Sequence, residues 1–177
     1  TQNYVFAIKQ DLGVFVIDPE TDEVVDIIEG CFSTMAQSKD GNIWVGVNYQ
    51  EEGYESNLQY PYGWNGNAWN GSQLMCIDQY TLETRCVDLE EGGVPQSWYA
   101  WTAGTLTASN TENALYFVYT DPSAGQINWF RNCKLYRYDI DNNECEEIYN
   151  SETDGLYFYG GAIQCNPKDG NIYAALY

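Results

Sequence analysis

Alternating apolar and polar residues in three segments of the chain predict β-hairpins. The segments are GVFVIDPETDEVVDII at 13–28, QLMCIDQYTLETRCVDL at 73–89 and KLYRYDIDNNECEEIYN at 134–150. In each, an alternating stretch ends in Asp, a short polar turn follows, and a second stretch returns. An Asp at the start of such a turn can accept a backbone N–H two residues further on. We therefore expect Asp18, Asp78 and Asp139 to open three equivalent turns.

A second kind of strand–turn–strand segment alternates with the first. Its copies are FSTMAQSKDGNIWVGVN at 32–48, GTLTASNTENALYFVYT at 104–120 and GAIQCNPKDGNIYAALY at 161–177. Two copies carry KDGN at the turn, where Gly41 and Gly170 can supply the positive φ of a tight hairpin. The opening residues 3–10 match the return strand of this motif. No stretch shows helical periodicity, so we expect no helix.

The two motifs together form a repeat of roughly 60 residues with four short antiparallel strands, which is typical of a β-propeller blade. With strands named a to d from the centre outward, the chain supplies b-c-d, two sets of a-b-c-d and a final a-b. We predict an all-β fold, one partial β-propeller domain over 1–177 with about three four-stranded antiparallel blades. Its parts are a blade remnant at 1–30, a blade at 31–90, a blade at 103–150 and the start of the next blade at 160–177.

The ring of this predicted propeller is incomplete. Propellers close with about four to eight blades. The missing blades come either from a longer polypeptide, which we favour, or from another chain, and their number stays open. A β-sandwich built from the same hairpins is the alternative fold.

Two segments also resemble a known family. VIDPETDEVV and SKDGNIWVGV are similar to the YVTN or YncE-like propeller repeat, although the second and third hairpins lack its Pro and its Val-rich return strand. The resemblance implies the fold, but the superfamily includes surface proteins, ligand binders and quinoprotein-like enzymes. Acidic, Tyr-rich and Asn-rich versions resemble surface lipoproteins of gut bacteria, some of which bind cobalamin for an outer-membrane uptake system. A cobalamin-like ligand and an outer-membrane transporter as partner are expectations from this resemblance alone.

The charge balance limits the classes of molecule that can bind this protein. The chain has 26 acidic and 7 basic residues, a formal net charge of -19, so nucleic acid and anionic lipid are poor partners. No apolar run approaches the roughly 18 residues of a membrane span, and we expect no membrane insertion. The absence of His excludes a Ser-His-Asp triad, a Cys-His dyad and a His-ligated metal. An enzyme would have to use carboxylates, Tyr, Lys or a metal held by oxygens.

Six cysteines without a CxxC pair leave two interpretations open. Their even number, with the acidic composition, favours an oxidising, extracytoplasmic setting. Equally, they can be small buried hydrophobic residues. A tight turn after Asp78 pairs Cys76 with Arg85 and aims Cys86 at the other face of the sheet, so a Cys76–Cys86 disulfide would need a longer turn.

The connections between predicted strands sort onto two faces. In a propeller the a-b and c-d turns share one rim, and here all of them are short. The long connections on the other rim are b-c at 49–71 and 121–132 and d-a at 90–102 and 151–159. The candidate ligand-binding residues on them are Tyr60, Tyr62, Trp64, Trp69, Trp98, Tyr99, Trp101, Trp129, Arg131, Tyr157 and Tyr159.

Aromatic side chains on a rigid scaffold offer large amphipathic contact area, and neighbouring Asn, Gln and Gly offer hydrogen bonds. This composition suits an uncharged polyhydroxylated or planar ligand. The alternative is that the rings pack the long loops onto the blades. We predict a non-catalytic, cell-surface or periplasmic protein that binds a glycan or a cobalamin-like small molecule, with no cofactor and no catalytic residues. A protein-interaction scaffold, and a quinoprotein-like enzyme or a lyase using Tyr and Arg131, are the alternatives.

The sequence DIDNNE at 139–144 matches the start of a calcium-binding loop. Glu144 stands where the loop needs Gly, and the twelfth position is Asn150. We therefore interpret the segment as a polar hairpin turn and predict no metal site.

Overall fold

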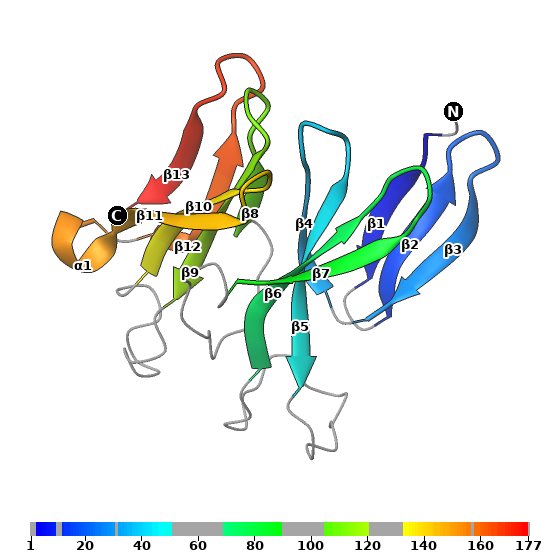
Figure 1. Ribbon diagram of the computed structural model, residues 1–177, viewed down its shortest axis with the longest axis horizontal. Helices are drawn as coiled ribbons and strands as arrows, with labels where there is room; N and C mark the ends of the chain where they lie inside the picture. The colour runs from blue at the N-terminus through cyan, green and yellow to red at the C-terminus, as the bar shows by residue number, and fades with distance from the viewer. Residues whose placement is uncertain are drawn as a thin grey trace.

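The computed structural model describes residues 3–9, 12–30, 32–50, 69–89, 105–120, 133–156 and 158–176. Within them the protein is all-β apart from one short helix, and the strands form four antiparallel sheets. The strands follow the alternation of apolar and polar residues that predicted them. Figure 1 shows the sheets side by side, from the N-terminal sheet at one end to the C-terminal sheet at the other.

Each sheet holds strands that are consecutive in the chain. The first sheet contains β1 (Val5–Lys9), β2 (Gly13–Asp18) and β3 (Glu23–Glu29). The second contains β4 (Phe32–Gln37), β5 (Ile43–Gln50), β6 (Trp69–Ile77) and β7 (Thr84–Asp88). The third contains β8 (Leu106–Ala108), β9 (Ala114–Thr120), β10 (Cys133–Asp139) and β11 (Glu144–Asn150). The fourth contains β12 (Phe158–Cys165) and β13 (Ile172–Leu176).

The helix α1 (Ser151–Asp154) corrects the expectation of no helix. The Asn150 side chain caps its start by accepting the Glu152 backbone N–H (3.0 Å). Gly155 ends it in the left-handed region with φ 87. A helix of four residues is too short to show a period in the sequence, so only its caps could have predicted it.

The sheets pack face to face, because both faces of the inner sheets are apolar. In β5, Ile43 and Val45 pack towards the first sheet, and Trp44 between them packs towards the third. A separate cluster, which includes Leu135 and Ile163, joins the third sheet to the fourth. The leading strands of successive sheets also meet, since β4 contacts β8 and β8 contacts β12. The described residues thus form one open row of sheets.

Trp44 is the centre of the interface between the second and third sheets. Its side chain is fully buried, and its ring meets Tyr138 edge-on at a centroid distance of 5.9 Å. The Arg85 guanidinium lies over the Trp44 ring, 5.1 Å from its centroid. The indole N–H donates to the Ser38 hydroxyl (3.0 Å), which satisfies the buried donor. This residue therefore links the core to the turn between β4 and β5.

Candidate functional site

The strands alternate in direction, so the connections between them emerge at two opposite edges of the row. The turn edge carries the short turns that follow β2, β4, β6, β8, β10 and β12. The long-connection edge carries the strand ends Gln50, Trp69, Thr120 and Cys133, from which connections 51–68 and 121–132 leave. In Figure 1 the turns after β2, β4 and β12 point upwards, whereas β5 ends at the lower side. The long connections 51–68 and 121–132 therefore share one edge, as expected, and the short β1–β2 and β3–β4 connections lie on that edge too.

Most of the candidate ligand-binding residues lie outside the described residues. They are Tyr60, Tyr62, Trp64, Trp98, Tyr99, Trp101, Trp129, Arg131 and Tyr157. The structure places two others by their backbone: Trp69 opens β6 opposite Gln50, and Tyr159 lies in β12.

The expected limits of two long connections are corrected by these strands. The connection expected at 49–71 spans 51–68, because Tyr49 and Gln50 pair with Asn70 and Trp69. The connection expected at 151–159 begins with α1 and ends before Phe158. The sequence did not predict the start of β6, because the Asn and Gly residues next to Trp69 have low strand propensity.

The three equivalent aspartates open three equivalent turns, as predicted. Asp18 Oδ1 accepts the Glu20 N–H (2.8 Å), and Asp78 Oδ1 accepts the Tyr80 N–H (2.8 Å). Asp139 Oδ1 accepts the N–H groups of Asp141 and Asn142 (both 3.1 Å).

These hydrogen bonds affect the aspartate pKa values. The Thr81 and Tyr80 backbone N–H groups lower the pKa of Asp78, and the Asn142 backbone N–H lowers that of Asp139. The carboxylates therefore act as fixed acceptors that hold the turns.

The same turns place a non-glycine residue in the left-handed region. The residues are Asp22, Leu82 and Asn143, with φ of 59, 60 and 55. Each stands four residues after its turn aspartate, so the three turns share one backbone conformation. Leu82 is the most unusual of the three, because a side chain without a local hydrogen bond rarely adopts this region. The sequence shows no glycine there to signal it.

The KDGN turns also have the predicted geometry, with φ of 92 at Gly41 and 74 at Gly170. Contacts between turns of neighbouring sheets fix them further. Lys39 Nζ donates to the Thr111 carbonyl (2.8 Å), and Asn110 Nδ2 donates to the Pro167 carbonyl (2.7 Å). The turns of the second, third and fourth sheets are thus linked in a chain along the turn edge.

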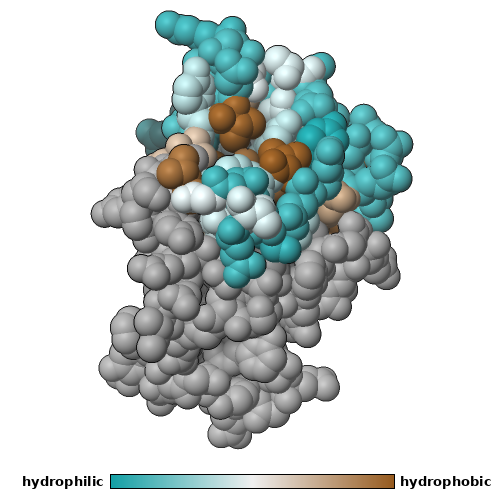
Figure 2. Space-filling model, turned by 90° about the vertical axis from the view of Figure 1, so that its left-hand side faces the viewer, coloured by the Kyte–Doolittle hydropathy of each residue, from teal (hydrophilic) through white to brown (hydrophobic). Residues whose placement is uncertain are grey.

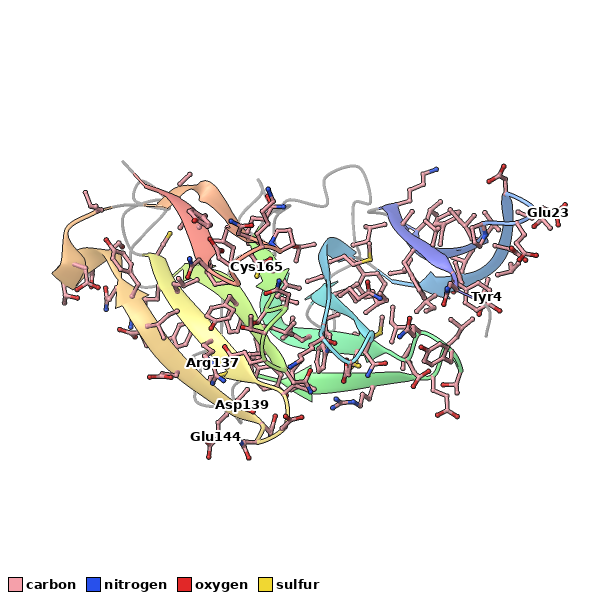
Figure 3. All side chains as sticks on the ribbon, turned by 90° about the horizontal axis from the view of Figure 1, so that it is seen from above. Tyr4, Glu23, Arg137, Asp139, Glu144 and Cys165 are labelled. Carbon is pink, nitrogen blue, oxygen red and sulfur yellow. The ribbon has the colours of Figure 1, made fainter. Side chains whose placement is uncertain are left out.

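A polar cluster on the third sheet was not predicted. Arg137 in β10 donates to both Glu112 oxygens (3.2 and 2.6 Å), and the Tyr116 hydroxyl donates to the same carboxylate (2.7 Å). Figure 3 shows Arg137 beside Asp139 on β10; the closest oxygen of Asp139 lies 3.4 Å from Nη2. Arg137 and Glu112 are 25 positions apart in the sequence, and only strand pairing brings them together.

This polar cluster has no arrangement suited to acid–base catalysis. Hydrogen bonds from Arg137 and Tyr116 lower the pKa of Glu112, which stays a carboxylate. Burial and the bond to Glu112 raise the pKa of Tyr116 to about 12, so its phenol stays protonated at neutral pH. With both partners partly exposed, the ion pair contributes about 1 kcal/mol or less to stability. We assign the cluster to holding β9 against β10.

The described residues contain no group of three or more Cys, Asp or Glu side chains that could hold a metal ion. The 139–144 segment is a hairpin turn, as its interpretation from the sequence predicted. Within the described ranges there is also no helix with the length and hydropathy of a membrane span.

The cysteines in the described part of the chain are free thiols: Cys76, Cys86, Cys133, Cys145 and Cys165. Cys76 pairs with Arg85 and is buried, whereas Cys86 pairs with Met75 and is exposed. The predicted register is therefore confirmed, and the two sulfur atoms face opposite sides of the sheet. Burial raises the pKa of Cys145 to about 11, so that thiol is a poor nucleophile.

Comparison with known proteins gives a family and a fold. Residues 1–177 match the family model described as "Domain of unknown function (DUF5074)". Curated proteins gave no match. A similar solved structure is the extracellular domain of a one-component system from B. thetaiotaomicron, with a TM-score of 0.55 and 15% identity. The similarity covers 98% of this chain and 18% of that one, so this chain spans less than a fifth of its length.

Proposed function

The chain belongs to the DUF5074 family, and from that premise we propose that it is part of a β-propeller that binds an uncharged ligand outside the cytoplasm, without catalysis. The observation that carries the proposal is the position of the strand ends. The aromatic connections 51–68 and 121–132 both leave from the long-connection edge, opposite the fixed turns. Both of these ring-rich connections thus leave from one edge of the molecule.

The order of the sheets supports the propeller. The second and third sheets each contain four antiparallel strands in chain order, and their leading strands β4 and β8 contact each other. The first sheet has equivalents of the last three strands only, and the fourth sheet has equivalents of the first two. Sheets that are apolar on both faces and packed in a row are what a ring of blades requires.

The ligand class follows from the residues on the long-connection edge. Connection 51–68 carries Tyr54, Tyr60, Tyr62 and Trp64 among Asn and Gly residues. Aromatic faces and amide groups suit a glycan or another neutral ligand with planar and polar faces. The cobalamin-like option rests on the resemblance to propeller lipoproteins alone.

The proposed location outside the cytoplasm has two supports. The similar solved structure is an extracellular domain, although at 15% identity that likeness concerns the fold. The formal net charge of -19 is also compatible with a solvated surface that stays clear of anionic lipid. Fractionation of cells that express the full-length polypeptide, followed by protease treatment of intact cells, tests the location. Protection of the protein in intact cells would contradict a surface location.

A fluorescence titration tests the ligand. Tryptophan emission of the full-length polypeptide is followed against a panel of neutral glycans and against cobalamin. We expect quenching or a shift with one class, because Trp64 and Trp69 would contact the ligand while buried Trp44 gives a constant background. The double variant Trp64→Ala/Trp69→Ala should lose at least tenfold in affinity and keep its Tm. Unchanged emission with every ligand would remove the proposal.

A matched control variant is Tyr80→Ala. Tyr80 is 56% exposed and lies on the turn edge, so its loss should change neither affinity nor Tm. If Trp64→Ala/Trp69→Ala instead lowers the Tm and spares binding, the rings are a local core of the connection.

A further inference from the structure

One face of the first sheet is apolar and open. Its side chains come from two rows of paired residues, Val5–Ile17–Val24 and Ala7–Phe15–Ile27. Val5, Val24 and Ile27 are 50%, 49% and 42% exposed. Large apolar side chains on three adjacent strands form a contiguous patch, which is rare on the surface of a monomeric protein unless something binds it.

The other face of the same sheet is packed normally. Val14 is fully buried there, and Phe6, Ile8 and Ile28 pack with it against Ile43 of the second sheet and its neighbours. Among the described residues, the sheet therefore has two apolar faces and one partner sheet. Sheets with both faces apolar are found where both faces are covered.

The turn aspartates identify which face of the second and third sheets is equivalent to the open face of the first. In the second sheet the residues one and three before Asp78 are Ile77 and Met75, which are 0% and 7% exposed because they pack on the first sheet. In the third sheet the same positions before Asp139 are Tyr138 and Tyr136, 1% and 5% exposed against the second sheet.

In the first sheet the same two positions before Asp18 are Ile17 and Phe15, which lie on the open face. In the second and third sheets these positions meet the preceding sheet. The open face is therefore the surface with which the first sheet would meet a preceding sheet.

We propose that this face, defined by Val5, Ala7, Phe15, Ile17, Val24 and Ile27, docks a further antiparallel β-sheet of the same repeat, contributed by polypeptide that precedes residue 1 in the full-length protein. The centre of the face has no charged side chain, and Lys9 and Glu29 stand at its end. Such a surface matches an apolar sheet face with a polar rim. The inference rests on the repeat architecture of the proposed function but needs no ligand, so a failed ligand titration would leave it intact.

A second copy of residues 1–177 fits this face less well. The free end of the row is the fourth sheet, which has two strands and would leave β3 uncovered. Figure 2 views that end and shows mainly hydrophilic residues with isolated hydrophobic ones. Gln164 is exposed there and Tyr173 is 57% exposed. A preceding sheet is thus the occupant of matching size and polarity.

Hydroxyl-radical footprinting tests the proposal without any substitution. Oxidation of Val24 and Ile27 is compared between residues 1–177 alone and the full-length polypeptide. We expect roughly fivefold or greater protection in the full-length protein, in proportion to a fall from 42–49% exposure to the 0–7% of the corresponding buried residues. Ile148, equally exposed at 42% on an outermost strand, is the internal control and should react equally in both.

A double variant gives a second measurement. Val24→Lys/Ile27→Lys should lower the Tm of the full-length protein by about 5 °C or more, because it places charges in a covered interface. In residues 1–177 alone it should reduce binding of the dye ANS and leave the Tm nearly unchanged. Ile148→Lys is the matched control and should be nearly neutral in both proteins.

Three results would overturn the proposal. One is equal oxidation of Val24 and Ile27 in the two proteins. Another is a full-length polypeptide with no further strands before Thr1. The third is protection of the face in residues 1–177 alone together with sedimentation as a dimer, which would make a second copy the occupant.

Discussion

The turn edge and the long-connection edge terminate the same strands but are built differently. The turn edge consists of short turns held by side chains: Asp78 binds two backbone N–H groups, and Lys39 and Asn110 link neighbouring turns. The long-connection edge carries long, aromatic-rich connections such as 51–68, which contains three Glu and no Lys or Arg. Short turns held by side chains can keep a row of sheets in place while longer connections at the opposite edge carry binding residues, an arrangement common in scaffolds. The difference can be tested by weakening the turn edge.

The largest effect is expected from Trp44, which ties the turn edge to the core. Trp44→Ala removes a fully buried ring and leaves Ser38 without its indole donor. It should lower the free energy of unfolding by about 3–5 kcal/mol, measured by urea denaturation. Trp44→Phe keeps most of the packing and should cost less than half as much. A loss below about 1 kcal/mol for Trp44→Ala would show that the core does not hold this edge.

A smaller effect is expected from Gly170, where two costs combine. Its φ is 74, and an added Cβ would lie 2.5 Å from Thr111 Cγ2 on the neighbouring sheet. Gly170→Ala should lower the free energy of unfolding by about 2 kcal/mol. Gly155→Ala is the control: its φ is 87 but nothing lies within 4 Å, so only the backbone strain of about 1 kcal/mol remains. Equal losses in the two variants would mean that contacts between turns contribute nothing.

The smallest effect concerns pH. The pKa of Asp78 in the folded protein lies below its ordinary value of 3.8, so the ionised carboxylate stabilises the fold. That contribution is complete above pH 3.8 and is lost as the pH falls through the lower, folded-state pKa. The Tm difference between the parent and Asp78→Asn should therefore be largest near neutral pH and shrink in acid.

The control for this pH dependence is Glu146→Gln, an exposed carboxylate on β11 outside the turns. Its Tm difference from the parent should stay small across the same pH range. A Tm difference between the parent and Asp78→Asn that grows in acid would contradict the role of the carboxylate as a turn acceptor.

Local rules predicted much of the fold. Alternation of apolar residues predicted the hairpins, and the positions of Asp18, Asp78 and Asp139 predicted the turns. The turn length predicted that Cys76 and Cys86 lie on opposite faces of the sheet. Each depends on residues within about ten positions of one another, where backbone geometry decides the result. The start of β6 at Trp69 was missed, because its pairing with Gln50 across a long connection overrides weak strand propensity.

The candidate site shows the limit of the same rules. Strand order was enough to bring connections 51–68 and 121–132 to one edge. The Arg137–Glu112–Tyr116 cluster gave no signal, since an Arg between apolar residues reads as an ordinary solvent-facing position. Only the pairing of β9 with β10 decided its partners.

By itself, the sequence determined most of the strand segments and the positions of the turns, because these properties follow from short-range periodicity and turn chemistry. The tertiary structure alone decided which apolar face is covered. Tyr136 and Tyr138 are buried while Phe15 and Ile17, at the same positions of the repeat, face an open side. The pattern of residues is alike in both places, and what differs is whether a neighbouring sheet removes them from water.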